Sequence, residues 1–351
     1  MNTPGTEFRL LGPLEVHDTR TGRHLPVPGA RQRALLAVLL VEADRTVSVE
    51  RLAEELWGDR PPRSAPNAVQ AHIARLRKLL PPPTPEPPPT PGTGIVTTPG
   101  GYLLRLADAT TDAQRFCLLS AEGRAVAATE PDRAVTLLSS ALALWRGPAL
   151  ADCRSGPICT AEADRLEEHR LITLEAFYEA RLRSARPDGI TGELERLTDE
   201  HPLRERFYDL LMVALHRTER RGEALAVYER ARHRLMAELG VEPGPSLRGR
   251  REALLRHEAS LSPVRLWPGS RSDEDPYPPP YAPHATAETD ELTRIGEHLA
   301  VLTRQLQQLT TRFEALTTHH PTPPDNPDHS HEERTAGHCG PIRGTEPPAR
   351  K

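Results

Sequence analysis

The sequence is short of several residue types, and each shortage excludes a class of protein. Of its 45 basic residues only Lys78 and Lys351 are lysines, and neither follows a glycine. A P-loop nucleotidase requires a Gly-Lys-Ser/Thr motif, so this class is excluded. A Schiff-base enzyme is disfavoured because Lys78 lies in an arginine-rich helix. No stretch approaches 18 consecutive apolar residues and the N-terminus lacks the apolar core of a signal peptide, so we expect a cytoplasmic protein.

Cysteine and catalytic motifs are equally sparse. The four cysteines (Cys117, Cys153, Cys159 and Cys339) are far apart and form no CxxC pair, so neither a disulfide framework nor a zinc ribbon is indicated. The sequence contains no Gly-x-Ser-x-Gly and no His-Glu-x-x-His motif, so we expect no enzyme, no metal and no cofactor. The 37 prolines and the low hydrophobic content, 37%, predict ordered cores separated by segments that do not pack.

Positive charge is concentrated in the N-terminal third. Residues 1–107 carry a net charge of +3, whereas residues 108–261 carry −3 and residues 262–351 carry −4. Between Arg60 and Leu80 there are five basic residues and no acidic one. This stripe is either an electrostatic footprint for phosphate or a solvated helix face.

The first third has a recognisable order of elements. Segments 8–16 and 24–27 are predicted to be short strands, followed by helices over 31–41, 48–58 and 64–80 and by a β-hairpin formed by 95–98 and 102–106. In the third helix, Val69, Ile73, Leu76 and Leu80 share one face. The opposite face carries Asn67, Ala71, Ala74 and Lys78, flanked by Gln70, Arg75 and Arg77. Small residues, amides and cations without a carboxylate are what a helix needs to enter the major groove of DNA.

The runs 29–40, 49–58, 65–79 and 99–102 together resemble the OmpR-type winged helix-turn-helix, in the form found in the Streptomyces antibiotic regulatory protein (SARP) family. The runs 141–150, 165–168, 201–205, 211–215 and 238–243 are similar to the second domain of that family, the bacterial transcriptional activation domain. The resemblance implies an OmpR-type winged helix over 7–107 and an activation domain, TPR-like and all-α, over 108–258. The fold class is thus mainly α, with an α+β N-terminal domain.

The resemblance also implies a function and a set of contacts. It implies a sequence-specific transcriptional activator of an antibiotic biosynthetic cluster that binds double-stranded promoter repeats and recruits RNA polymerase, without ATP. With the helix pattern, it assigns Asn67, Gln70, Ala71 and Arg75 to bases, Arg63, Arg77 and Lys78 to phosphates, and the hairpin tip at Thr97, Thr98 and Gly100 to an adjacent minor groove or backbone. A structural ion pair is the alternative role of Arg77. The segment Pro81–Pro91, with eight prolines, is longer than the resemblance leads us to expect.

Residues 112–258 have the periodicity of helices throughout. Apolar stripes mark helices near 135–145, 171–182, 203–217 and 221–239. The last two form a helix–turn–helix unit whose Ala224 and Tyr228 are spaced as in tetratricopeptide repeats. We expect most of these residues to form core stripes.

The C-terminal third is predicted to contain one helix between two unstructured segments. Residues 262–285 are proline-rich and acidic and predict a disordered linker, and residues 319–351 predict a disordered tail. Over 286–318 the spacing of apolar residues alternates between three and four at Leu292, Ile295, Leu299, Leu302, Leu306, Leu309, Phe313 and Leu316. A strict 3.5-residue period favours a coiled coil and hence a homodimer. The alternative is an amphipathic helix that docks on its own helical domain or on a partner protein.

A different class of function fits part of the same sequence. An adaptor or scaffold would bind proteins through the helical domain while its N-terminal domain no longer reads DNA. The carboxylate-free outer face of helix 64–80 favours the DNA-binding, nucleoid-associated activator.

Overall fold

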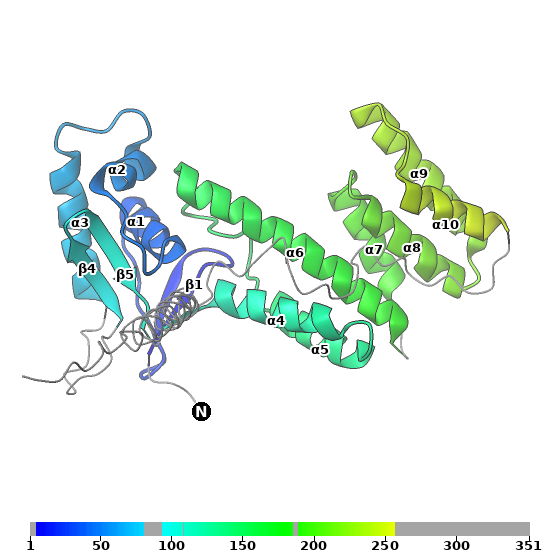
Figure 1. Ribbon diagram of the computed structural model, residues 1–351, viewed down its shortest axis with the longest axis horizontal. Coiled ribbons are helices and arrows are strands. Elements are labelled where there is room, and N and C mark those ends of the chain that lie inside the picture. The colour runs from blue at the N-terminus through cyan, green and yellow to red at the C-terminus, as the bar shows by residue number, and fades with distance from the viewer. Residues whose placement is uncertain (1–4, 81–92, 108, 185–188, 257–351) are drawn as a thin grey trace, which may run out of the picture. The chain divides into compact units, whose positions relative to one another are not determined.

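The computed structural model describes residues 5–80, 93–107, 109–184 and 189–256 (Figure 1). The proline-rich segment Pro81–Pro91, the linker 262–285, the predicted coiled coil 286–318 with its eight seam residues, and the tail 319–351 all lie outside these residues. Within them, the expected architecture is confirmed: a small N-terminal domain of helices and short strands is followed by helices alone.

The N-terminal sheet has the strand order β3-β2-β1-β6. Its strands are β1 (Thr6–Arg9), β2 (Glu15–Asp18), β3 (Arg23–His24) and β6 (Thr110–Thr111). Strand β1 pairs antiparallel with β2 and parallel with β6, which comes 100 residues later in the chain. The prediction of one strand over 8–16 is wrong. Gly12, at φ 148°, and Pro13 reverse the chain between β1 and β2, so the segment forms two strands.

Three helices and a hairpin follow β3, as predicted. They are α1 (Ala30–Val41), α2 (Val49–Trp57), α3 (Ala65–Leu79), β4 (Gly94–Thr98) and β5 (Gly101–Arg105). Ser48 is the N-cap of helix α2, as expected from the sequence, and its Oγ accepts the Arg51 N–H at 3.2 Å. The hairpin is tied to the loop before α2 by reciprocal bonds between Val47 and Tyr102. A Cβ on Gly101 would lie 2.0 Å from the Val47 carbonyl oxygen, so only glycine permits this approach.

The second part of the described chain is all-helical. Its helices are α4 (Asp112–Val126), α5 (Pro131–Leu142), α6 (Pro157–Arg183), α7 (Ile190–Glu200), α8 (Glu205–Arg217), α9 (Arg221–Leu239) and α10 (Pro245–Leu255). Helices α4 and α5 lie along α6 (Figure 1). Helix α8 packs against α6 and α7. Ala224 and Tyr228 of α9 are buried, in agreement with their prediction as core residues.

One hydrophobic core crosses the expected boundary between the two domains. It contains Phe8 of β1 and residues of α1–α3, but also Phe116 of α4 and Leu166 of α6. A second core joins the C-terminal half of α6 to α7–α10 and contains the fully buried Phe207 and Leu211. The first half of the activation domain therefore shares its core with the N-terminal domain.

Two buried carboxylates join the parts on either side of this boundary. Asp112, the first residue of α4, accepts the Leu10 N–H at 2.6 Å and the Leu11 N–H at 3.1 Å. Burial raises the pKa of its carboxyl, and these two bonds oppose the shift. Glu55 of α2, 1% exposed, accepts the N–H groups of Ile158 and Cys159 at the start of α6, both at 2.9 Å.

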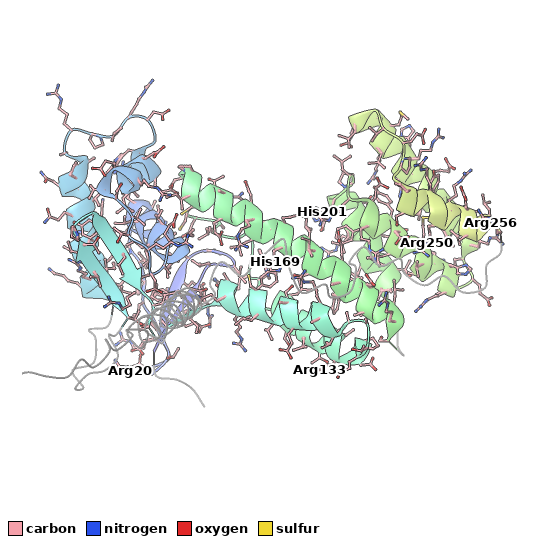
Figure 2. All side chains as sticks on the ribbon, viewed as in Figure 1. Arg20, Arg133, His169, His201, Arg250 and Arg256 are labelled. Atoms are coloured by element: carbon pink, nitrogen blue, oxygen red, sulfur yellow. The ribbon has the colours of Figure 1, made fainter. Side chains whose placement is uncertain are left out.

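The far end of the helical domain is also fixed by a buried ion pair. Arg250 of α10, labelled in Figure 2, donates through Nε to Asp209 Oδ1 of α8 at 2.6 Å. Arg206 donates to the other oxygen of Asp209 at 2.7 Å. Because a buried ion pair requires good geometry, the three side chains hold α10 in one position on α8.

The cysteines of the described residues belong to the hydrophobic core. Cys117, Cys153 and Cys159 are free and buried, and burial raises the pKa of the Cys117 thiol to about 11. A thiol that stays protonated is a poor nucleophile, so they are best explained as packing residues. Among the described residues, no helix is both long enough and apolar enough to cross a membrane.

Candidate nucleic-acid interface

Helix α3 divides into a buried face and an exposed face as the sequence predicts. Val69, Ile73 and Leu76 are fully buried against the N-terminal core, and Leu80 just beyond the helix is nearly so. The exposed side chains of the opposite face are those of Asn67, Gln70, Ala71, Ala74, Arg75, Arg77 and Lys78. The structure thus brings together all the candidate residues of α3 on one solvent-facing surface.

This surface is cationic. Within the described ranges, no carboxylate pairs with Arg63, Arg75 or Lys78. Arg63 lies in the turn between α2 and α3, and it is exposed together with Arg60. An unpaired guanidinium or ammonium group on an exposed helix is available to a phosphate or to the edge of a base.

Arg77 differs from the other cations because it binds the hairpin. Its Nε donates to the Ile95 carbonyl oxygen at 3.0 Å, and its Nη2 donates to Thr97 Oγ1 at 2.7 Å. Its guanidinium also lies 5.9 Å from the centre of the Tyr102 ring. The partners of Arg77 are therefore a carbonyl, a hydroxyl and a ring of the hairpin.

The hairpin β4–β5 has the form and position of the wing of a winged helix. Its tip contains Thr97 and Gly100, both exposed, and the half-buried Thr98. Figure 1 shows the hairpin beside α3, and Arg77 joins the two directly. The predicted tip residues thus lie next to the exposed face of α3 and extend it on one side.

The structure adds two residues that the sequence analysis did not single out. Arg31, in the first turn of α1, and His72 of α3 line one open groove with Arg75. Arg31 is positioned by Trp57 of α2, whose ring centre lies 5.7 Å from the guanidinium carbon. No local motif marks these residues, because they come from helices about 40 residues apart, and only the packing of α1 on α3 brings them together.

Comparison with family models identifies both parts of the chain. Residues 28–103 match the family "Transcriptional regulatory protein, C terminal", and residues 111–255 match the "Bacterial transcriptional activator domain". The two matches follow one another in the order of the two structural parts.

Individual proteins are similar in sequence over most of the chain. The chain is 41% identical over 276 residues to the transcriptional regulator RedD of Streptomyces coelicolor, covering 78% of this chain and 75% of RedD. It is 37% identical to the regulatory protein DnrI of Streptomyces peucetius, covering 73% of this chain and 94% of DnrI.

A solved structure is similar in fold as well as in sequence. The structure of Mycobacterium tuberculosis EmbR in complex with a low-affinity phosphopeptide superposes with a TM-score of 0.64 and 34% identity. The match covers 72% of this chain but 65% of EmbR, so about a third of EmbR has no counterpart in it.

Proposed function

This chain belongs to the SARP family of DNA-binding transcriptional activators, and from that membership we propose that it controls a secondary-metabolite biosynthetic cluster. In this proposal it binds repeats in the promoter DNA of the cluster and recruits RNA polymerase. It acts at the nucleoid of the cytoplasm, without enzymatic activity or a cofactor.

One observation carries the proposed mode of DNA binding. The exposed face of α3 combines amides, alanines and cations, and the described residues place no carboxylate in an ion pair with Arg63, Arg75 or Lys78. An α-helix with small residues at its centre approaches the floor of the major groove closely, where amide side chains pair with adenine and arginine pairs with guanine. We therefore assign Asn67, Gln70, Ala71 and Arg75 to base contacts.

Contacts to the backbone surround these base contacts. We assign Arg63 and Lys78 to phosphates, and the wing tip at Thr97, Thr98 and Gly100 to the adjacent minor groove or backbone. Arg77 belongs to the same surface, and its bonds to β4 support a second role in holding the wing. Phosphate contacts set the orientation of a protein on DNA and make its affinity depend on salt.

The test uses the full chain and a duplex selected by it from a randomised DNA library. Lys78→Ala should weaken binding to the selected duplex and to a scrambled duplex alike, and should reduce the slope of log affinity against log salt by about one. The matched control is Arg115→Ala, since Arg115 is also an exposed, unpaired cation on a helix of the described chain. An unchanged slope would overturn the Lys78 assignment, and no binding by the wild type at low salt would favour an adaptor.

Activation is tested separately from binding. Transcription from the protein's own target promoter by purified RNA polymerase should rise on addition of the full chain, without nucleotide hydrolysis by the protein. Equal transcript yield with and without the protein would contradict an activator role.

We further propose that two copies share one site through residues 286–318. The eight apolar seam residues, of which Leu292 is the first and Leu316 the last, lie outside the described structure. Their heptad spacing is the support for the proposed dimer. Sedimentation should give a dimer for the full chain and a monomer for a chain ending at Pro283. A full-length monomer at micromolar concentration would exclude the coiled coil.

A further inference from the structure

An open groove of about 470 Å³ separates the start of α1 from the exposed face of α3. Gly29 and the first three residues of α1, Ala30, Arg31 and Gln32, line it on one side, and His72 and Arg75 line it from α3. Arg31 and Arg75 are exposed, and His72 is half-buried. The described residues thus bound the groove with two permanent cations and one titratable side chain, and none of those that line it is acidic.

The groove and the wing lie on opposite flanks of α3. At 100° per residue, Arg77 and Gln70 lie on one flank of α3, and Arg75 and His72 lie on the other. Arg77 contacts strand β4, so the wing occupies the first flank. The groove occupies the second flank, beside α1.

A helix in the major groove lies between two sugar-phosphate backbones. The major groove is about 12 Å wide, so a helix that reaches the bases has one backbone on each flank. With the wing on one side of α3, the second backbone passes along the side that carries Arg31 and His72. Arg31 is positioned by the Trp57 ring, and His72 lies on α3, which packs against α1.

We propose that the groove between α1 and α3 binds a backbone phosphate of the DNA through Arg31 and His72, with Arg75 at the border between this phosphate and the bases. The inference rests on the proposed function, and it adds to it a second phosphate site on the flank of α3 opposite to the wing. The ligand is a phosphodiester, so the site contributes affinity and orientation without reading sequence.

The environment of His72 supports an anionic ligand. In the free protein, burial and the nearby charges of Arg75 and Arg31 hold the pKa of His72 below its ordinary value of 6.5. Its Nδ1 has no hydrogen-bond partner among the described residues. A phosphate placed between Arg31 and Arg75 would offset both charges and raise the pKa of His72, so DNA binding would be coupled to uptake of a proton.

The shift in the pKa of His72 determines whether the affinity for DNA rises or falls with pH. Because the pKa is higher in the complex than in the free protein, affinity is greatest at low pH and falls as pH rises through the range between the two values. Arg31 from α1 and Arg75 from α3 are the charged groups that act on His72, and neither changes its charge in this range.

Salt titration of the full chain tests the role of Arg31. Arg31→Ala should reduce affinity several-fold for the selected duplex and for a scrambled duplex alike, with the salt slope lower by about one. Arg31→Lys should restore the slope because it keeps the charge, and Arg115→Ala should leave both quantities unchanged. If the wild type binds but Arg31→Ala behaves as Arg115→Ala does, the inference is wrong while the proposed function stands.

A pH titration tests the role of His72. The affinity of the wild type should decrease between about pH 5 and pH 7.5, a window set by the histidine pKa, whereas that of His72→Gln should change less over this range. Equal pH profiles for the two proteins would show that His72 is not part of the phosphate site. Failure of the wild type to bind any selected duplex would overturn both this inference and the proposed mode of DNA binding.

Discussion

The buried carboxylate of Glu55 links the N-terminal domain to the helical domain. It belongs to α2 by sequence, but both of its oxygens accept N–H groups from the first turn of α6. The N-terminus of a helix carries partial positive charge, so a carboxylate is favoured there. Gly156 permits the contact, because a Cβ at this position would lie 2.4 Å from the Glu55 Cδ atom.

Replacing Glu55 should therefore destabilise the whole protein. In Glu55→Gln one of the two acceptors becomes a donor that faces an N–H group, and loss of a charge-assisted bond costs about 1.5–3 kcal/mol. Urea denaturation of the full chain, followed by circular dichroism, would measure this change. Glu54→Gln is the matched control, since Glu54 is exposed on the same helix, and equal stability of the two variants would show that the α6 contact is not stabilising.

At the scale of elements, the wing and the recognition helix form one unit. Arg77 connects α3 to β4, and the loop before α2 connects to β5 through Val47 and Tyr102. The hairpin is thus attached at both edges, to α3 on one side and to the loop between α1 and α2 on the other. Its tip has a defined position relative to the face that carries Gln70 and Asn67.

The variant Arg77→Lys distinguishes the effect of the Arg77 charge from the effect of its hydrogen bonds to β4. Arg77→Lys keeps the charge but cannot make both bonds to β4, since lysine lacks the planar fork of arginine. If Arg77 positions the wing, affinity for the selected duplex should fall by about tenfold, equivalent to ~1.4 kcal/mol, with an unchanged salt slope. Full affinity in Arg77→Lys together with a reduced slope in Arg77→Ala would instead indicate a phosphate contact alone.

Sequence periodicity predicted the elements that have one buried face. Helix α3 follows its predicted pattern because Val69, Ile73 and Leu76 pack on a single core. The strand prediction over 8–16 failed because Leu10, Leu11 and Leu14 are all buried at a reversal of the chain, which a local pattern does not distinguish from a strand. The groove at Arg31 and His72 was missed for a related reason: it exists only through the packing of distant helices.

At the scale of the whole described chain, the expected boundary near residue 107 does not divide two independent cores. Strand β6 pairs with β1 after that boundary, and Asp112 binds the backbone of Leu10 and Leu11. Arg146 adds a bond from its backbone N–H to the Leu11 carbonyl oxygen. The N-terminal domain is completed by residues that the family models assign to the activator domain.

A fragment of residues 1–107 should therefore fold poorly. It would expose the apolar surfaces that Phe116, Leu150 and Leu166 cover, and it would lack the partners of Glu55 and of the Leu10 amide. A fragment of residues 1–256 retains all of these contacts. Thermal unfolding followed by circular dichroism should be cooperative for 1–256 and broad, at lower temperature, for 1–107. Cooperative unfolding of both fragments at similar temperatures would contradict the shared core.

The shared core also sets where such a regulator can be cut and rejoined. A chimaera that exchanged DNA specificity by splicing a foreign N-terminal domain at residue 107 would place unrelated side chains against Phe116 and Leu166 and leave the start of α6 without its carboxylate. A splice within α6, between Leu166 and Tyr178, would keep the buried residues of the first core together but would separate Ala134 and Leu138 of α5 from Ala180 of α6, with which they pack. The unit that can be inherited or transplanted is then the DNA-binding domain together with α4, α5 and α6, and a change of target promoter by recombination would have to move these parts together.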